Sequence, residues 1–146
     1  MADAREIGAR WVAAFNAHDE EGMRALTAEH GVIEAPGDVH IEGRDAVTGY
    51  AMSWLNAFSD ATLTVHTEIA EGAWVAQRFT FAGTHDGVLA SPAGQMAPTQ
   101  RRLEGRGVQM VRVENDAVVE TQLYFDQVQV MTQLGLMPEA APQASA

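Results

Sequence analysis

The chain has 146 residues, 47% of them hydrophobic, which is enough for one domain with a buried core. No apolar run approaches the roughly 20 residues that are needed to span a bilayer. Its formal net charge of −11 argues against nucleic acid and anionic membranes as partners, and the lack of cysteine excludes disulfides, thiol nucleophiles and thiolate metal sites. The charged N-terminal segment does not match a secretion signal, so we expect a cytoplasmic protein.

The first predicted element is an amphipathic helix over residues 3–18. Ile7, Trp11 and Phe15 recur on one face at helical spacing. Asp3 stands directly before this pattern and is the predicted N-cap.

The next segment predicts a second helix, two short strands and a third helix. Asp19 opens the short second helix. The strands are expected over 31–37 and 39–43, separated by a Pro-Gly turn. A longer helix, rich in large apolar side chains, then runs from Gly43 to Phe58.

From residue 61 onward the alternation of side chains predicts long strands. Residues 61–72 and 73–85 form one hairpin, and 101–113 and 117–128 form another. The segment 85–100 between them has two glycines, two prolines and no helical period, so we expect a loop.

Helices followed by long antiparallel strands predict an α+β fold, with about three helices packed in the hollow of a strongly curved antiparallel sheet. Such a sheet forms a cone with a mouth. We expect a single domain over residues 1–138, followed by a disordered tail at 139–146.

An acidic residue stands at the end of the last predicted strand. Alternation places Gln122, Tyr124 and Asp126 on one face and Leu123 and Phe125 on the other. A carboxylate buried there is costly unless it is paired or protonated, and the same conditions shift its pKa toward proton transfer. The simpler interpretation is that Asp126 leaves the strand in solvent.

Several segments between Trp11 and Pro138 follow a recognisable pattern. They are FNAHDEEGMRAL, EGRDAV, AFSDATLTV, RFTFAGTHDG, PTQRRLEGRGVQMVRVENDAVVE and YFDQVQVMTQLGLMP. In these segments the chain resembles the SnoaL-like polyketide cyclases, or ester cyclases, of the nuclear transport factor 2-like superfamily. It departs from the better-known cyclases in its loop, where APTQR replaces PPTGR.

The resemblance implies a cone-shaped α+β barrel with a deep apolar pocket, no metal or organic cofactor, and a homodimer or higher homo-oligomer. It implies that Asp126, in the YFD motif, is the general acid/base of an intramolecular aldol ring closure or a related isomerisation. His85, in the GTH motif, would lie at the rim or wall of the pocket.

One carboxyl group can both remove a proton α to a carbonyl and protonate the new alkoxide, provided that its pKa lies near the working pH. The charge on the enolate needs a hydrogen-bond donor, which His85, Gln122 or Tyr124 could supply. The residues expected to contact a hydrophobic, oxygenated substrate are Tyr50, Trp54, Phe79, Gln109, Gln122 and Tyr124.

Three classes of function stay open. The first is a cofactor-free acid/base enzyme, with an epoxide-opening or hydroxylating relative that would need an Asp–Arg pair in the pocket. The second is a non-catalytic protein that binds a small hydrophobic ligand. The third is an interaction scaffold, for which the cone would be filled.

Two further expectations concern metals and assembly. His40 and His66 have acidic neighbours, but their spacing matches no known metal motif. The outer face of the sheet is expected to expose Leu103, Met110 and Val111 and to mediate homodimerisation.

Overall fold

The computed structural model describes residues 2–91 and 94–137, so the predicted tail lies outside the described residues. Its helices are α1 (Ala4–Asn16), α2 (Glu20–Leu26), α3 (Arg44–Ala57) and α4 (Gln127–Gln133). Its strands are β1 (Thr27–Ala35), β2 (Val39–Glu42), β3 (Thr62–Glu71), β4 (Trp74–Thr84), β5 (Leu89–Ser91), β6 (Gly94–Met96), β7 (Arg102–Glu114) and β8 (Ala117–Phe125).

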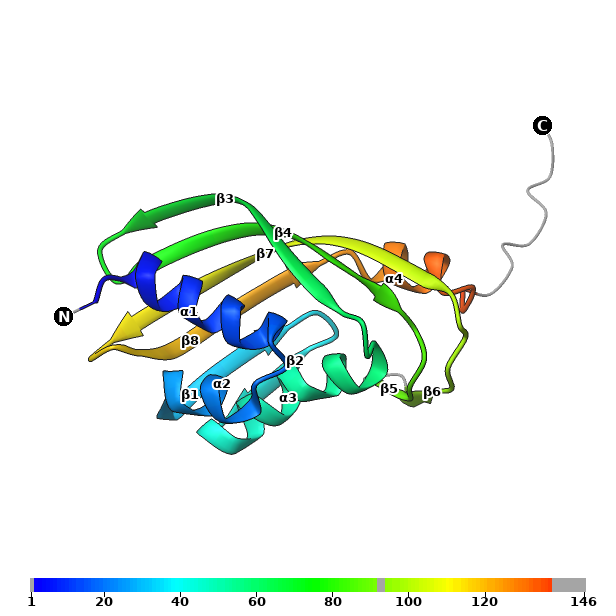
Figure 1. Ribbon diagram of the computed structural model, residues 1–146, viewed down its shortest axis with the longest axis horizontal. Helices are drawn as coiled ribbons and strands as arrows, with labels where there is room; N and C mark the ends of the chain where they lie inside the picture. Colours follow the sequence, from blue (N-terminus) through cyan, green and yellow to red (C-terminus); the bar gives the residue numbers. More distant parts are fainter. Residues whose placement is uncertain (1, 92–93, 138–146) are drawn as a thin grey trace.

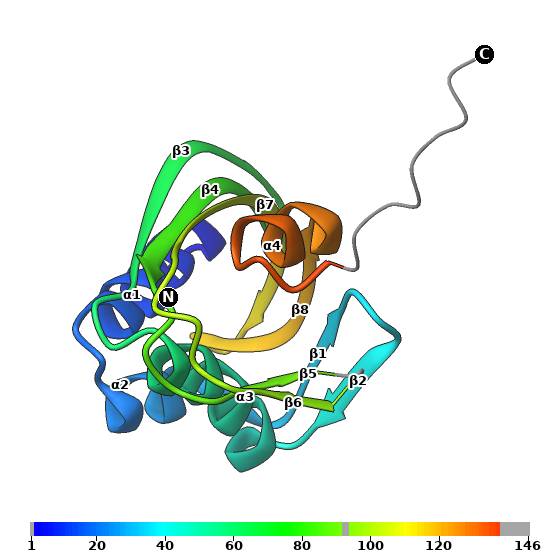
Figure 2. The ribbon, with the colours of Figure 1, turned by 90° about the vertical axis from the view of Figure 1, so that its right-hand side faces the viewer.

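Six of the strands form one curved sheet in the order β2-β1-β8-β7-β4-β3. The α+β class and the two long hairpins are confirmed, but the sheet is mixed because β1 runs parallel to β8. Parallel neighbours need a long connection, and most of the chain lies between these two strands. The two edge strands, β2 and β3, are not neighbours in the described sheet, so the barrel stays open (Figure 2).

Helices α1 and α3 lie in the hollow of the sheet (Figures 1 and 2). The side chain of Asp3 accepts a hydrogen bond of 2.8 Å from the backbone N–H of Glu6, which confirms the predicted N-cap. Gly8 allows α1 to approach β4, because a Cβ atom there would lie 3.0 Å from Val75 Cγ1. None of the described helices is long and apolar enough to cross a membrane.

The segment predicted as a loop contains a short hairpin. Strands β5 and β6 pair with each other, and β5 packs against α3. Leu89 at the start of β5 is almost fully buried, which anchors the hairpin to the core.

Helix α4 differs from the prediction, which continued the last strand to Val128. Strand β8 ends at Phe125, and Asp126 becomes the N-cap of a new helix. The sequence carried a signal for this change, since Gln129 follows Asp126 at the three-residue spacing typical of a capping box.

Glutamine side chains attach α4 to β7. Gln129 Oε1 accepts a hydrogen bond of 3.0 Å from the backbone N–H of Arg106. Gln133 Oε1 accepts one of 2.7 Å from the N–H of Glu104, and its Nε2 donates one of 3.1 Å to the Glu104 carbonyl. Beyond the end of β8, α4 therefore supplies hydrogen bonds to the backbone of β7 that a neighbouring strand would otherwise supply.

Candidate functional site

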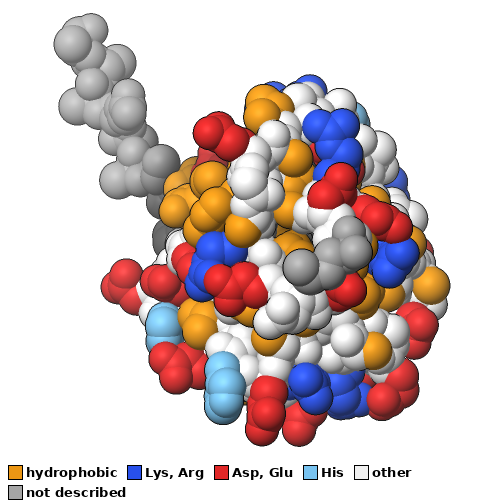
Figure 3. Space-filling model, turned by 90° about the vertical axis from the view of Figure 1, so that its left-hand side faces the viewer, with side chains coloured by type: hydrophobic (Ala, Val, Ile, Leu, Met, Phe, Trp, Pro, Cys, Tyr) orange, Lys and Arg blue, Asp and Glu red, His pale blue; other side chains and the backbone are white. Residues whose placement is uncertain are grey.

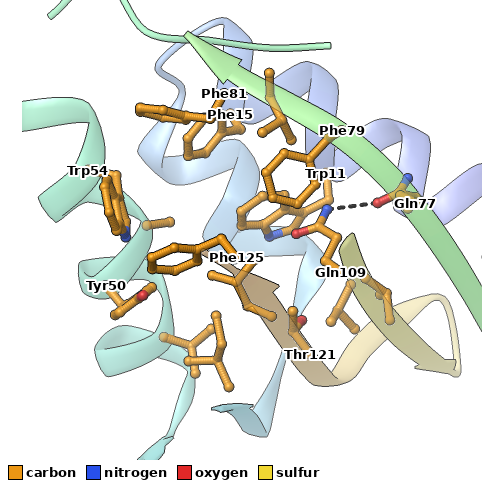
Figure 4. A pocket seen from close by; sticks show the side chains of 18 of the residues that line it. Trp11, Phe15, Tyr50, Trp54, Gln77, Phe79, Phe81, Gln109, Thr121 and Phe125 are labelled. Atoms are coloured by element: carbon orange, nitrogen blue, oxygen red, sulfur yellow. Dashed lines mark hydrogen bonds between the residues drawn. The ribbon is translucent and has the colours of Figure 1, made fainter. Parts of the chain in front are cut away.

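The hollow of the sheet contains a deep cavity enclosed by α1, α3, α4 and the inner faces of β4, β7 and β8. The space among its lining atoms, solvent at the mouth included, is about 940 Å³, of which about 90 Å³ admits the centre of a water molecule. Figure 4 shows ten of its lining residues: Trp11, Phe15, Tyr50, Trp54, Gln77, Phe79, Phe81, Gln109, Thr121 and Phe125. The cone is therefore not completely filled by its own side chains.

The cavity wall is mainly aromatic and aliphatic. No Asp, Glu, His, Lys or Arg is among the described residues that line it. The polar side chains in the wall are amides, hydroxyl groups and the indoles of Trp11 and Trp54. Such a wall suits an apolar ligand whose orientation is fixed by a few hydrogen bonds.

Aromatic rings form one side of the cavity. Trp54 meets Phe81 and Phe125 edge to face, with ring centroids 5.6 and 5.5 Å apart. Trp11 stacks on Phe15 at 5.6 Å. These contacts hold the rings in fixed orientations and present flat surfaces that fit cyclic or conjugated ligands.

Tyr50 is the titratable group in the wall. Burial raises the pKa of its hydroxyl above 10.0, and a hydrogen bond with Trp54 partly opposes the rise. The group is consequently protonated near neutral pH and available for hydrogen bonding.

Two glutamines from adjacent strands meet inside the cone. Gln77 on β4 is the cross-strand partner of Gln109 on β7, and Gln109 Nε2 donates a hydrogen bond of 2.7 Å to Gln77 Oε1. Gln77 is fully buried and Gln109 nearly so. Gln109 is among the residues expected in the site, whereas Gln77 is not, although Gln77 is in phase with the buried Val75 and Phe79 along its strand.

The structure places Asp126 outside the cavity. Its exposed carboxylate accepts a hydrogen bond of 3.1 Å from the backbone N–H of Gln129. On β8, Leu123 and Phe125 line the cavity instead, because burial favours the apolar face of the strand. The expectation that the Asp126 carboxyl faces the cavity is wrong, and the simpler interpretation fits the structure.

The other outward residues of β8 follow the same alternation. Gln122 donates hydrogen bonds to Glu34 and Glu120, and Tyr124 is 58% exposed. Neither lines the cavity, so the structure does not place them where a ligand in the cone was expected to lie.

Four of the expected substrate contacts do line the cavity. Tyr50 and Trp54 reach it from successive turns of α3, and Phe79 and Gln109 reach it from β4 and β7. Figure 4 shows these side chains converging on the same space.

His85 is fully buried, but it does not line the cavity. Its ring stacks on Phe58 at 5.3 Å, and its Nδ1 accepts a hydrogen bond of 3.3 Å from the backbone N–H of Thr99. The proton therefore belongs on Nε2, which has no partner among the described residues. Burial lowers the pKa of His85, and an interaction with the backbone of Gly87 partly opposes the fall. The contacts of Nδ1 with the backbone N–H and the hydroxyl of Thr99 anchor the 85–100 segment, away from the cavity.

The acidic neighbours of His40 lie on the outer face of the sheet. His40 Nε2 is 2.9 Å from Glu42, whose hydrogen bond raises the pKa of the imidazole, and Nδ1 is 3.9 Å from Glu34. Within residues 2–91 and 94–137 there is no group of three or more His, Cys, Asp or Glu residues that could hold a metal ion.

Comparison with known proteins gives a consistent result. The sequence model of the SnoaL-like polyketide cyclases matches residues 6–134. No curated protein matches significantly.

Solved structures share the fold over 90% or more of this chain. IdmH from Streptomyces antibioticus, a proposed polyketide cyclase, is 29% identical, with a TM-score of 0.76 over 92% of this chain and 99% of that one. AclR from Streptomyces galilaeus, a proposed hydroxylase, is 25% identical, with a TM-score of 0.76 over 92% and 97%. An epoxide hydrolase-like protein of M. tuberculosis shares the fold alone, at 17% identity and a TM-score of 0.70 over 90% and 88%.

Proposed function

This chain belongs to the SnoaL-like polyketide cyclase family, and on that premise we propose that it binds a hydrophobic, oxygenated metabolite of polyketide type in its cone and promotes ring closure by holding the substrate folded. The observation that carries the proposal is the composition of the cavity wall. Rings and aliphatic groups shape the space, while amides and hydroxyl groups supply hydrogen bonds.

Confinement by itself accelerates an intramolecular reaction, and an aldol ring closure has no net proton demand, because the proton that leaves the acidic carbon between two carbonyls passes by way of solvent water to the new alkoxide oxygen. A flexible chain loses conformational entropy when its two ends meet, and a site that holds it in the reactive shape pays this cost on binding. The fixed rings around Trp54 supply that shape. A protonated hydroxyl such as that of Tyr50 can polarise a carbonyl without removing a proton.

A wall of this kind does not favour two related types of enzyme reaction, acid/base catalysis by a carboxylate and epoxide opening or hydroxylation by an Asp–Arg pair. Proton abstraction by a carboxylate requires an acid in the cavity, and Asp126 lies outside it. Epoxide opening or hydroxylation by an Asp–Arg pair lacks both partners among the described lining residues.

The second candidate function is a carrier that binds the same class of ligand without turnover. The absence of ionisable acids and bases among the described lining residues, apart from Tyr50, favours it. Binding and turnover therefore need separate measurements.

Binding can be followed through the tryptophans of the cavity. Trp74 lies outside it, beneath the Arg112 guanidinium, so Trp74→Phe leaves Trp11 and Trp54 as reporters. We expect a polycyclic aromatic ketone to quench their fluorescence with saturation. Turnover is tested by liquid chromatography coupled to mass spectrometry after incubation with a linear polyketone thioester, because a ring-closed isomer has the mass of its substrate and differs only in retention unless water is lost.

A pocket-filling variant supplies the specificity control. A Cβ atom at Gly105 would lie 3.8 and 3.9 Å from Leu103 and Val130, so Gly105→Leu extends a side chain into the cavity without a backbone clash. Gly49→Ala is the matched control, because nothing lies within 4 Å of its Cβ position. Equal quenching in Gly105→Leu and Gly49→Ala would contradict binding in the cone, and saturable binding without any cyclised product would favour the carrier.

A further inference from the structure

We infer that the Gln77–Gln109 pair is a hydrogen-bond donor for the ligand and that it selects an apolar compound with a ketone carbonyl at the inner end of the cavity. This inference rests on the proposed function, since it assigns the polar contact within the same pocket.

The first observation is an unpaired amide nitrogen. Gln77 is 0% exposed, and its Nε2 has no hydrogen-bond partner among the described residues. It lies against α1, where a Cβ atom on Gly8 would be 3.1 Å away. A buried NH₂ group without an acceptor is unfavourable and uncommon in folded proteins.

The second observation is that the two amides are coupled. Gln109 donates to Gln77 across 2.7 Å, and the terminal torsion of a glutamine side chain has two broad orientations. If both amide groups rotate by half a turn about their terminal torsions, Gln77 donates a hydrogen bond to Gln109, and the two side chains stay bonded. The oxygen of Gln77 then faces Gly8, and the NH₂ group of Gln109 faces the cavity (Figure 4).

The arrangement with both amide groups rotated is the more favourable one when a ligand is present. Buried carbonyl groups with unused lone pairs are tolerated better than orphaned N–H groups. The donor is also moved from a helix surface that offers no acceptor to a cavity that a ligand occupies. The site therefore presents N–H to the ligand, and a carbonyl oxygen is the matching group.

The surroundings of Gln109 limit what else the ligand can carry there. The neighbouring lining residues Phe79, Val111 and Leu123 are apolar, and Thr121 supplies a hydroxyl group. A charged group would be desolvated without a counter-ion, whereas a neutral ketone needs one or two donors. The inferred ligand class is a neutral cyclic or polycyclic ketone.

The experiment compares α-tetralone with tetralin, two molecules of similar shape that differ by the carbonyl oxygen. Dissociation constants are measured by equilibrium dialysis with the wild-type protein and with Gln109→Met, which keeps the side-chain length. Gln122→Met is the matched control, because that glutamine is on the adjacent strand and does not line the cavity.

We expect the wild-type protein and Gln122→Met to bind α-tetralone about tenfold more tightly than tetralin, which corresponds to about 1.4 kcal/mol. In Gln109→Met the two ligands should bind equally. Equal affinities in the wild-type protein would overturn the inference and leave the proposed function standing. If neither ligand binds, the proposed function itself fails.

A second measurement needs no variant. Hydrogen bonding to a carbonyl oxygen lowers the infrared stretching frequency of the C=O bond. For α-tetralone bound to the wild-type protein, we expect a frequency below that in hexane. A bound frequency equal to the hexane value would show that no donor reaches the carbonyl, even if Gln109→Met does not fold.

Discussion

Asp126 shows how the position of one residue at an element boundary decides its role. Its carboxylate caps the first turn of α4, so we expect its contribution to be structural. Because Asn is about as good an N-cap as Asp, we expect Asp126→Asn to change the free energy of unfolding by less than about 0.5 kcal/mol, whereas Asp126→Ala costs about 1 kcal/mol.

Urea denaturation of both variants, together with the ligand titration, checks this prediction. Ligand binding and turnover should be unchanged in Asp126→Asn. A folded Asp126→Asn protein that binds ligand but loses most of its turnover would restore the acid/base mechanism.

His85 predicts a pH dependence of stability. Burial lowers the pKa of its imidazole below 6.5, the ordinary value that applies in the unfolded chain. The unfolded state therefore takes up the proton first as the pH falls. The stability that neutral His85 contributes is present above about pH 6.5 and is lost as the pH falls toward the lowered pKa of the folded state.

Thermal unfolding between pH 7.5 and 5 measures this effect, with His85→Gln expected to show a smaller loss of stability on acidification than the wild type. His40→Gln is an informative control, because the contribution of His40 to stability changes with pH in the opposite direction. The hydrogen bond with Glu42 raises the pKa of His40, so its contribution is present below pH 6.5 and is lost as the pH rises through the raised pKa. Identical pH profiles for wild type and His85→Gln would refute the prediction.

At the scale of elements, the attachment of α4 rests on glutamine side chains. Gln133 makes two hydrogen bonds to the backbone of Glu104. A hydrogen bond contributes about 0.5–1.5 kcal/mol, so Gln133→Ala should lower the free energy of unfolding by about 1 kcal/mol and speed amide hydrogen exchange in α4. Gln127→Ala, on the exposed first residue of the same helix, should change neither quantity, and equal exchange rates in both variants would contradict the docking role.

The sequence predicted the elements whose pattern is repeated over many residues. Helices α1 and α3 and the two long hairpins were recognisable because apolar residues recur with a period of 3.6 or 2 over nine or more positions, whereas the seven-residue α2 was recognised from its N-cap, Asp19. Helix α4 has only seven residues, and its β-branched valines continue the strand pattern before it.

The same reasoning explains what could be predicted of the site. Tyr50, Trp54, Phe79 and Gln109 are in phase with buried faces, and they do line the cavity. On β8 the apolar Leu123 and Phe125 face the cavity, whereas the family resemblance implied an inward Asp126, because burial of the apolar side chains decides which face of the strand turns inward. Pairing of Gln77 with Gln109 depends on the register of β4 against β7, which a single sequence does not determine.

At the scale of the whole molecule, the outer face of the sheet remains the predicted dimer interface. Leu103 and Val111 were expected on this face but are buried in the cone, since they alternate with the outward residues of β7. Met110 and Tyr124 are the large exposed groups on the outer face of β7 and β8, at 39% and 58% exposure.

We expect sedimentation to show twice the 15.7 kDa mass of the chain. Met110→Glu should shift the equilibrium toward the monomer, while Val128→Glu, on α4, should not.

The net charge also predicts a dependence on salt. Acidic side chains, with basic ones between them, are scattered over the face seen in Figure 3. Because each copy has a net charge of −11, two copies repel each other. Dimerisation should therefore strengthen as salt is added, and a monomer at every salt concentration would disprove it.

The parallel pairing of β1 with β8 has a consequence for how the molecule is made. Strand β1 is among the first elements that emerge during synthesis, and its neighbour β8 is the last strand of the sheet. Until β8 arrives, α1, α3 and β1 have no complete wall to pack on, and their aromatic side chains remain exposed. Contacts between such distant segments slow folding. Until β8 is made, the apolar residues that later line the cavity are therefore exposed, and aggregation is the main hazard for a chain in that state.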